Sequence, residues 1–415
     1  MSEYWADSTL GEIYDVRDGT HDSPKYQEEG YALITSKNLK NGNITYDKVK
    51  FISESDYINI NKRSGVDVGD ILFAMIGTIG NPVVIKTEPN YSIKNVALFK
   101  VPDEQDSHFL KYYLESSYVK EKMQKEAKGT TQKFVGLGYL RSFPIRLPLL
   151  SEQKRIVTIL DEAFAGIDAA IANTENNLAN ACELFESYLN AVFTNEGKGW
   201  SPYKLVDLTT KIGSGATPKG GEKSYKTEGI SLFRSMNVYD RRFTDRKLAH
   251  IGDEQASKLS NVIVEEGDVL FNITGASITR CCITPKEYLP ARVNQHVSIL
   301  RPKLEKLDTN FLCYLMTSRI YKDKLLGIGD EGGATRQAIT KAQLQELVIT
   351  IPDDLNNQRE IIQQLDALAA ETLRLESIYK QKYASLIELK QSLLQKAFSG
   401  ELTAETDQLK EEAVA

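Results

Sequence analysis

Two glycine-flanked loops bring hydroxyl, amide and cationic side chains close together. The first is Gly129-Thr130-Thr131-Gln132-Lys133 and the second is Gly333-Ala334-Thr335-Arg336-Gln337. Arginine donates two parallel hydrogen bonds to guanine, and asparagine or glutamine pairs in the same way with adenine. Serine, threonine and backbone N–H groups hold phosphate. The two loops therefore carry the chemistry of a DNA contact.

Residues of the same chemical kinds lie in matching places in the two halves of the chain. The predicted DNA contacts are Ser36, Lys37, Asn38, Thr131, Gln132, Lys133, Thr217, Arg234, Ser235, Asn237, Thr274, Arg280, Gln295, His296, Thr335, Arg336 and Gln337. Such residues also stabilise turns by bonding their own backbone, and this alternative stays open for each single residue. Clusters at matching places in both halves favour DNA.

Motifs for catalysis are missing from the sequence. An adenine methyltransferase would carry Asn/Asp-Pro-Pro-Tyr/Phe, and Asn81-Pro82-Val83-Val84 lacks the second proline and the aromatic residue. The stretch that comes nearest to a P-loop, Gly215 to Glu222, lacks the lysine at the required place. The four histidines follow no zinc spacing. We predict no catalytic residue, no metal site and no cofactor bound by this chain.

An ordered series of matches shows that the sequence contains an internal repeat. Val68-Gly69-Asp70-Ile71-Leu72-Phe73 answers to Glu266-Gly267-Asp268-Val269-Leu270-Phe271. Gln153-Lys154-Arg155-Ile156 answers to Gln358-Arg359-Glu360-Ile361. The repeat is far longer than a solenoid unit of about 20–50 residues, so it indicates a duplicated domain with its following helix.

Each copy begins with short β-type runs, continues with one amphipathic helix (107–125 or 309–326) and a proline-bounded strand, and ends in a long helix. The fold class is α+β: two mixed domains joined by two long helices in an antiparallel coiled coil, with a pseudo-twofold repeat. The predicted segments are domain 1 (1–150), the first helix (151–195), domain 2 (196–354), the second helix (355–400) and a flexible acidic tail (401–415).

An apolar seam with steps of three and four runs along both long helices, as in a coiled coil. The seam residues expected to form the spacer and partner surface are Ile156, Leu160, Ile167, Leu178, Phe185, Ile361, Leu365, Leu375, Leu386 and Leu393. A helix of this length spans roughly 60 Å. The alternative is that each helix only covers its own domain.

Charge is distributed unevenly along the 415 residues, whose net charge is −6. Residues 151–195 hold 2 basic and 7 acidic residues, and residues 401–415 hold 1 and 5. Local clusters of Lys and Arg decide DNA affinity, so the total neither proves nor excludes it. The cysteines lack paired spacing, and we find neither a signal peptide nor an apolar run of about 18 residues. These features predict reduced thiols and a cytoplasmic location.

Two related domains on a stiff spacer would measure the distance between two DNA sites, because major-groove faces recur regularly along the helix axis. Since the domains differ in sequence, their half-sites should differ as well. The sequence therefore predicts an asymmetric bipartite target.

At this point the sequence resembles specificity subunits of type I restriction-modification systems. The shared features are the strand-to-helix junctions Leu147-Pro148-Leu149-Leu150-Ser151-Glu152-Gln153 and Ile351-Pro352-Asp353-Asp354, the Gly-Asp-Ile/Val-Leu-Phe motifs, Ile212 to Pro218, Asn294-Gln295-His296-Val297 and the closing run Ser392 to Leu402. The resemblance extends from about Leu10 to Leu402. The first copy departs from it at Asp18 to Pro24, at Lys94-Asn95 and at its end, Phe193 to Gly197, which puts residue-by-residue transfer in doubt.

The resemblance implies partners and places all catalysis in other chains. Double-stranded DNA is the ligand, and two methyltransferase subunits that carry S-adenosylmethionine and methylate adenine N6 dock on the helical regions. Motor-nuclease subunits that use ATP and magnesium join them. No membrane association is expected.

Two other functions are weighed against DNA recognition. A self-sufficient nuclease or methyltransferase is opposed by the missing motifs. A coiled-coil scaffold that binds proteins through two globular domains fits the repeat equally well, and only the family motifs oppose it. Salt separates the two, because phosphate binding weakens steeply as salt rises.

Overall fold

The computed structural model describes residues 5–129, 132–195, 197–330 and 338–404. The chain divides into two compact units, Met1–Glu175 with Gln381–Ala415, and Asn176–Lys380. Each unit joins one globular domain to parts of both long helices. The predicted division treated the helices as separate segments, whereas the compact units cut across them. Domain 1 and domain 2 below are the parts of each unit outside the long helices.

Domain 1 is built on a four-stranded antiparallel sheet, order β2-β10-β7-β8. A three-stranded sheet, order β6-β3-β9, packs beside it and contains a parallel pair, β3 with β9. The strands are β1 (Ala6–Thr9), β2 (Asp15–Asp18), β3 (Tyr31–Ile34), β4 (Leu39–Lys40), β5 (Asn43–Ile44), β6 (Lys50–Ile52), β7 (Ile71–Ala74), β8 (Gly80–Val84), β9 (Tyr91–Ile93), β10 (Val96–Lys100) and β11 (Pro144–Leu147).

Domain 2 repeats this topology with one added strand. Its antiparallel sheet has the order β13-β22-β19-β20, and its second sheet, β17-β14-β21-β18, again contains a parallel pair, β14 with β21. The strands are β12 (Trp200–Lys204), β13 (Thr209–Ser214), β14 (Ile230–Phe233), β15 (Val238–Tyr239), β16 (Arg242–Phe243), β17 (Ala249–Ile251), β18 (Ile263–Val264), β19 (Val269–Asn272), β20 (Cys281–Ile283), β21 (Ala291–Val293), β22 (Val297–Pro302) and β23 (Val348–Pro352).

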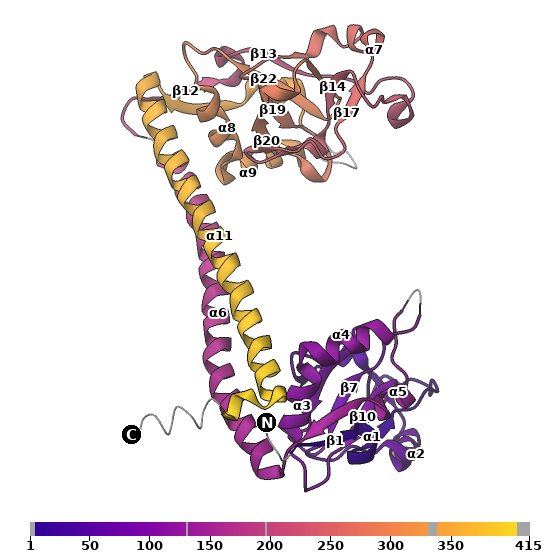
Figure 1. Ribbon diagram of the computed structural model, residues 1–415. Helices are drawn as coiled ribbons and strands as arrows, with labels where there is room; N and C mark the ends of the chain where they lie inside the picture. The colour runs from indigo at the N-terminus through magenta and orange to yellow at the C-terminus, as the bar shows by residue number, and fades with distance from the viewer. Residues whose placement is uncertain (1–4, 130–131, 196, 331–337, 405–415) are drawn as a thin grey trace, which may run out of the picture. The chain divides into compact units, whose positions relative to one another are not determined.

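Helices cover the sheets and link them (Figure 1). Domain 1 contains α1 (Leu10–Ile13), α2 (Glu54–Ser64), α3 (Ser107–Glu115), α4 (Ser117–Glu126) and α5 (Leu137–Arg141). Domain 2 contains α7 (Asp253–Ser257), α8 (Thr309–Thr317), α9 (Arg319–Asp330) and α10 (Lys341–Glu346). The long helices are α6 (Leu150–Thr194) and α11 (Leu355–Ser399). This confirms the predicted fold class.

The prediction of a single amphipathic helix over 107–125 and over 309–326 is wrong in both copies, because a serine divides each helix into two. Ser116 and Ser318 both leave the helical conformation, with ψ of 150° and 146°. The Ser116 hydroxyl bonds the carbonyl of Tyr113 at 2.7 Å, and Ser318 bonds Leu315 at 2.7 Å. Serine competes with the helix ladder in this way, so α3 and α8 end there and α4 and α9 begin at a new angle.

A buried glutamine near the start of each long helix ties that helix to its domain. Gln153 accepts from the Asp106 N–H at 3.0 Å and donates to the Pro148 carbonyl at 2.9 Å. Gln358 repeats both bonds, accepting from Asp308 at 2.9 Å and donating to Pro352 at 3.0 Å. Each glutamine is fully buried, so losing a partner would leave a polar group without water.

The end of each long helix packs on the domain of the other copy. Phe398, at the end of α11, lies 5.2 Å from Phe109 in domain 1, measured between ring centroids. Phe193, at the end of α6, lies 5.4 Å from Phe311 in domain 2. Each domain is therefore held by the first turns of its own helix and the last turns of the other.

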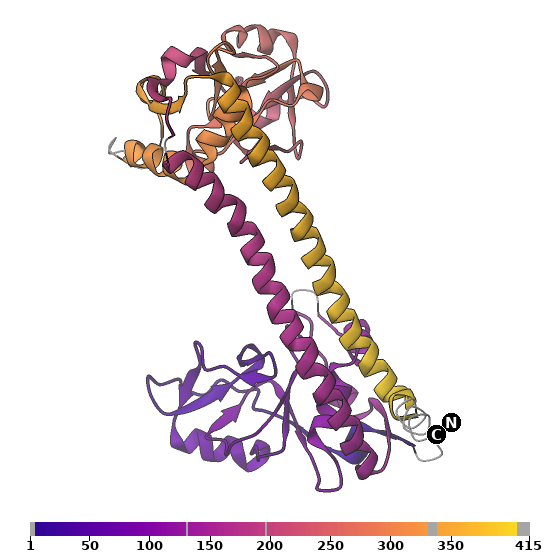
Figure 2. The same cartoon turned by 90° about the vertical axis from the view of Figure 1, so that its left-hand side faces the viewer.

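Within each unit the two helices run side by side in opposite directions (Figure 1, Figure 2). In the first unit Lys390 pairs with Asp168 at 2.8 Å. In the second unit Tyr188 donates to Gln364 at 2.9 Å, and Cys182 lies 3.4 Å from Glu376. The helices therefore pack on each other as well as on the domains, so the alternative that each helix only covers its own domain is wrong.

Most predicted seam residues are buried or partly buried. Ile156, Leu160, Ile167, Phe185 and Leu365 belong to the two main cores, and Ile361, Leu386 and Leu393 pack against them. Leu178 and Leu375 are half-buried.

On α11 the most buried seam positions lie one residue later in the chain than the spacing of three and four predicts. Ile362 and Leu394 are more deeply buried than Ile361 and Leu393, and Leu389 is 47% exposed. The seam must serve a domain at each end as well as the partner helix, which is why it departs from a uniform repeat.

The described part of the acidic tail is packed, although the sequence predicted a flexible segment. Leu402 is buried in the core of the first unit. The Thr403 carbonyl accepts a hydrogen bond from Arg155 at 3.3 Å. Residues 405–415 of the predicted tail lie outside the described residues.

The four cysteines are free thiols. Cys281 and Cys313 face each other in the core of domain 2 with their sulfurs 4.0 Å apart. Burial raises the pKa of the Cys281 and Cys282 thiols, which keeps them protonated and unreactive.

Phe193→Ala should reduce the free energy of unfolding of the second unit by about 3–5 kcal/mol, because it removes a buried ring from a packed core. Trp200 packs on Phe193 and reports the loss by fluorescence in urea, in a Trp5→Phe background that silences the other tryptophan. Leu184→Ala on the same helix is the control, because Leu184 is 50% exposed and should change little. Equal effects of the two variants would contradict the packing described above.

Candidate nucleic-acid interface

A surface hollow of about 550 Å³ gathers four of the predicted contact residues in domain 2. These four are Ser235, Thr274, Arg280 and His296, and the described lining is completed by Met236, Tyr239, Gly275, Ala276, Ser277 and Ala338. Among these described residues are a cation and several hydroxyl groups, and none is a carboxylate.

Four short elements converge to form this hollow. Ser235 begins a 3₁₀ turn after β14, Thr274 follows β19, Arg280 precedes β20 and His296 precedes β22. The predicted contacts thus lie at strand ends, where side chains face outward while the backbone is held by the sheet. Ala338 pairs with Thr274, which places the chain just after residue 337 at the rim.

A chain of hydrogen bonds links Thr217, Gln295, His296 and Thr274. The Thr217 hydroxyl donates to Oε1 of Gln295, whose Nε2 lies 3.0 Å from Nε2 of His296. Nδ1 of His296 lies 2.5 Å from the Thr274 hydroxyl oxygen. The chain joins two residues that line the hollow, His296 and Thr274, to the loop that carries Thr217.

The loop that carries Thr217 depends on Gly215. A Cβ at this position would lie 1.8 Å from the Val293 carbonyl oxygen, so no other residue fits. The same close approach recurs in domain 1, where a Cβ on Gly19 would lie 2.3 Å from the Ile93 carbonyl oxygen. Both loops are held against the strand end that precedes the key polar residues.

Tyr239 provides an aromatic platform beneath the cation of the hollow. The guanidinium carbon of Arg280 lies 4.8 Å from the centre of its ring, and that of Arg242 lies 5.3 Å away. Arginine is attracted to the face of an aromatic ring. Sequence reasoning missed Tyr239 and Arg242. Tyr239 lies 41 residues before Arg280, so local sequence spacing gave no signal of this contact.

Asn38 and Asn237 serve the fold, so the turn alternative is the one that their contacts support. Both amides are buried. Asn237 accepts from the Arg234 N–H at 3.1 Å and donates to the Thr244 carbonyl at 2.9 Å. Asn38 repeats this pattern with Thr35 and Thr45 at 3.0 and 2.9 Å. Reading a base with either amide would break these bonds.

Arg234 is also occupied by the protein itself. It donates to Glu222 at 3.1 Å and to the Lys247 carbonyl at 2.6 Å, and it packs over Tyr225. Only 12% of its side chain is exposed. It therefore stabilises the loop beside the hollow rather than lining it.

Domain 1 places Ser36 half-buried, bonded to the Asn95 carbonyl at 3.1 Å, and Lys37 exposed. Gln132 and Lys133 are exposed, and the Gly77 N–H donates to the Lys133 carbonyl at 2.9 Å. This strand-end contact corresponds to the one at Thr274 in domain 2. The structure thus brings these predicted residues to the equivalent end of the sheet.

At the same end of the domain 1 sheet lies a cluster of polar side chains, around His21, that the sequence did not predict. His21 bonds Asn95 at 2.7 Å and Asp18 at 2.8 Å. The bonds to Asn95 and then Asp18 raise the pKa of His21, because the charged ring donates from both nitrogens. Asp18 is buried and also pairs with Arg63. A lone histidine in a loop gave no signal of these partners.

Thr131, Thr335, Arg336 and Gln337 lie outside the described residues. Their predicted roles stay predictions. Their neighbours Gln132 and Ala338 both lie where the corresponding strand ends meet.

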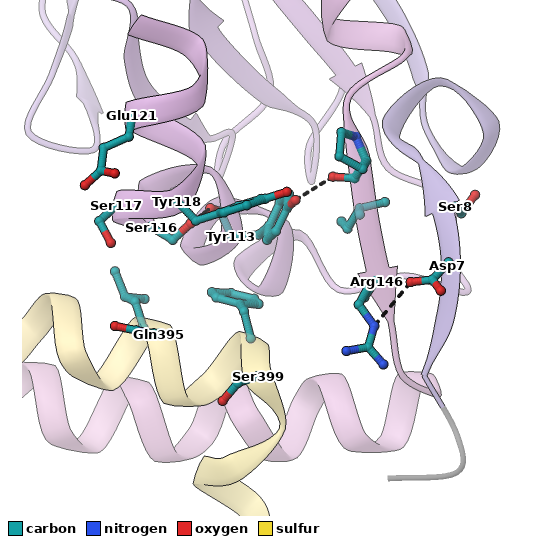
Figure 3. Close-up of a pocket in the computed structure, with 14 residues that line it drawn as sticks. Asp7, Ser8, Tyr113, Ser116, Ser117, Tyr118, Glu121, Arg146, Gln395 and Ser399 are labelled. Carbon is teal, nitrogen blue, oxygen red and sulfur yellow. Dashed lines mark hydrogen bonds and ion pairs between the residues drawn. The ribbon is translucent and has the colours of Figure 1, made fainter. Parts of the chain in front are cut away.

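A larger hollow, of about 750 Å³, lies in the first unit between domain 1 and the end of α11. The residues that line it include Leu394 and Phe398, as well as Glu121 and an Arg146–Asp7 ion pair of 3.2 Å (Figure 3). Among the described residues of this lining, the one cation, Arg146, pairs with Asp7, and Glu121 adds a negative charge, so the hollow has no net positive charge to attract phosphate. Two further hollows, in domains 1 and 2, also carry aspartates among the residues that line them.

Among the described residues, no three His, Cys, Asp or Glu side chains gather in a way that could hold a metal ion. Nor does a search of these residues find a helix that is long and apolar enough to cross a membrane.

Comparison with known proteins gives one consistent result. The family model described as type I restriction modification DNA specificity domain matches residues 2–180 and again residues 197–383. The EcoBI specificity subunit of Escherichia coli is 22% identical over 365 residues, which cover 81% of this chain and 74% of that protein. The StySPI specificity subunit of Salmonella potsdam is 23% identical, covering 91% and 84%.

Two solved structures share the fold. One, from work on complex assembly and conformational transition of the type I R-M system, has a TM-score of 0.77 at 21% identity and covers 97% of this chain and 99% of that chain. The HsdS subunit from Thermoanaerobacter tengcongensis has a TM-score of 0.60 at 21% identity and covers 97% and 98%.

Asn237→Ala should lower the stability of domain 2 by about 1–3 kcal/mol, because it leaves buried backbone groups without partners. Thermal unfolding of the full chain measures the change. Met236→Ala is the matched control, since its side chain is 39% exposed in the same turn. An unchanged melting temperature for Asn237→Ala would show that the buried amide does not support the turn.

Proposed function

Because this chain belongs to the family of type I restriction-modification DNA specificity domains, we propose that it reads DNA sequence for partner enzymes and catalyses no reaction itself. The observation that carries the proposal is the hollow of domain 2, whose described lining joins Arg280 to hydroxyl and imidazole groups and includes no carboxylate. Such a surface attracts an anionic ligand and offers donors to base edges. The alternative function, a scaffold that binds proteins, is not favoured.

Each domain reads one half of an asymmetric bipartite target. The two copies share the buried frame of Asn38 or Asn237 and Gln153 or Gln358. The side chains just before β10 and β22 differ, since domain 1 has Lys94-Asn95 where domain 2 has Gln295-His296. We call these strand ends, where the predicted contact residues gather, the mouth of each domain. A common frame with different mouth residues supports two readers of different half-sites.

The long helices set the gap between half-sites and dock two methyltransferase subunits. A continuous helix of 45 residues is about 67 Å long at a rise of 1.5 Å per residue. Exposed apolar residues on α11, including Leu373, Ile378 and Ile387, support contact with another chain.

The chemistry of the complex belongs to the partners. The methyltransferase subunits carry S-adenosylmethionine and modify adenine, and motor-nuclease subunits use ATP and magnesium. This chain contributes the choice of target and its orientation relative to those active sites. We place the assembly in the cytoplasm, where its DNA is.

Deleting this gene should abolish N6-methyladenine at one gapped, asymmetric motif in the host genome, because no other subunit selects that motif. Methylation-sensitive sequencing of the genome with and without the gene measures this directly. Reintroducing the gene should restore the same motif, which is the control.

An unchanged methylation map would contradict DNA recognition by this chain, provided that the methyltransferase subunits are expressed. Binding of the full complex to the motif should also weaken steeply as salt rises. A protein scaffold bound through apolar surfaces would not show this salt dependence.

A further inference from the structure

We propose that Arg280 recognises a guanine in the half-site of domain 2, with Tyr239 holding its guanidinium in place. This inference rests on the proposed function and goes further, because it assigns one residue to one base. It stands on the position, partners and surroundings of Arg280 among the arginines of its domain.

Most arginines of domain 2 are already engaged within the protein. Arg241 pairs with Glu186, Arg301 with Asp268, and Arg319 with Asp323. Arg234 pairs with Glu222, and Arg292 donates to the carbonyls of Ala256 and Ala291. An arginine held by a carboxylate has fewer N–H groups to offer a base.

Among the described arginines of the domain, Arg242, Arg246 and Arg280 have no carboxylate or carbonyl partner for their guanidinium groups. Arg242 and Arg246 are exposed, whereas Arg280 is half-buried and lines the hollow. Its position favours a base edge inserted into the hollow, while the exposed pair is better placed for phosphate.

The surroundings of Arg280 restrict its movement. Its carbonyl accepts from the Asn272 N–H at 2.8 Å, which anchors its backbone to β19. Its guanidinium lies over the Tyr239 ring at 4.8 Å, and contact with the ring reduces the freedom lost on binding. A guanidinium held in one orientation matches the two acceptors, O6 and N7, that guanine presents in the major groove.

Domain 1 offers no counterpart. The segment that joins β7 to β8 in domain 1, residues 74–83, contains no arginine. The Asn81 amide donates to the Leu39 carbonyl at 3.2 Å. An arginine contact of this kind is therefore expected in the half-site of domain 2 only.

The test uses the full chain with its methyltransferase subunits, bound in competition to duplexes that carry the motif with single base-pair replacements. Arg280→Ala should reduce discrimination at one G·C pair by about 5–150-fold and leave the other positions unchanged. Arg280→Gln should shift the preference at that pair toward A·T, since glutamine pairs with adenine.

Arg242→Ala is the matched control, because Arg242 lies over the same ring but is exposed. It should weaken binding to all duplexes alike and leave every discrimination ratio unchanged. Thermal unfolding verifies that each variant is folded, and Arg280→Gln keeps a hydrogen-bonding side chain should Arg280→Ala unfold.

Three results would overturn the inference. The first is uniform weakening by Arg280→Ala, which is the signature of a phosphate contact. The second is unchanged discrimination in both Arg280 variants, and the third is a half-site of domain 2 that contains no G·C pair. A wild-type complex that discriminates between no duplexes would instead refute the proposed function. The two failures are therefore distinguishable.

Discussion

The rest of the structure depends on the hydrogen bonds of two buried glutamines, Gln153 and Gln358. Each side chain sits where a strand ends and a long helix begins, and it bonds both the strand end and the loop before α3 or α8. Because these amides are removed from water, each bond must be made or the site loses stability. They fix the direction in which each helix leaves its domain, and thus where the reading surface lies relative to the helix.

Once the helices leave their domains in fixed directions, each unit can combine the start of one helix with the end of the other. Phe398 closes the core of domain 1 and Phe193 that of domain 2. The hydroxyls of Tyr112 and Tyr314 add a matching hydrogen bond to Asp161 and Asp366, which lie about three turns into α6 and α11. The frame is thereby the same in both copies, while strand ends at the mouth of each domain stay free to vary.

This separation of frame and mouth explains what could be predicted from sequence. Motifs such as Gln153-Lys154-Arg155-Ile156 recur because they form the frame, so the duplication and both helices were predictable. The contact residues were harder. Asn237 has the right chemistry for a base contact, but its amide already donates to the backbone carbonyls of Thr244 and Arg246. Arg280 and Arg234 look alike in sequence, and only the fold shows that Glu222 occupies one of them.

The remaining misses also have physical causes. The break at Ser116 depends on a hydroxyl that bonds its own helix, which helical periodicity does not reveal. The platform under Arg280 comes from Tyr239, on a hairpin 41 residues earlier in the chain, and local spacing carries no trace of that contact.

The central claim is that each domain reads its half-site independently on a common frame. It is tested most directly by replacing domain 1 with a second copy of domain 2, residues 196–354, and sequencing the methylated motif that results. We predict a symmetric motif in which the domain 2 half-site appears twice in inverted orientation. A motif that keeps two different halves would contradict the claim.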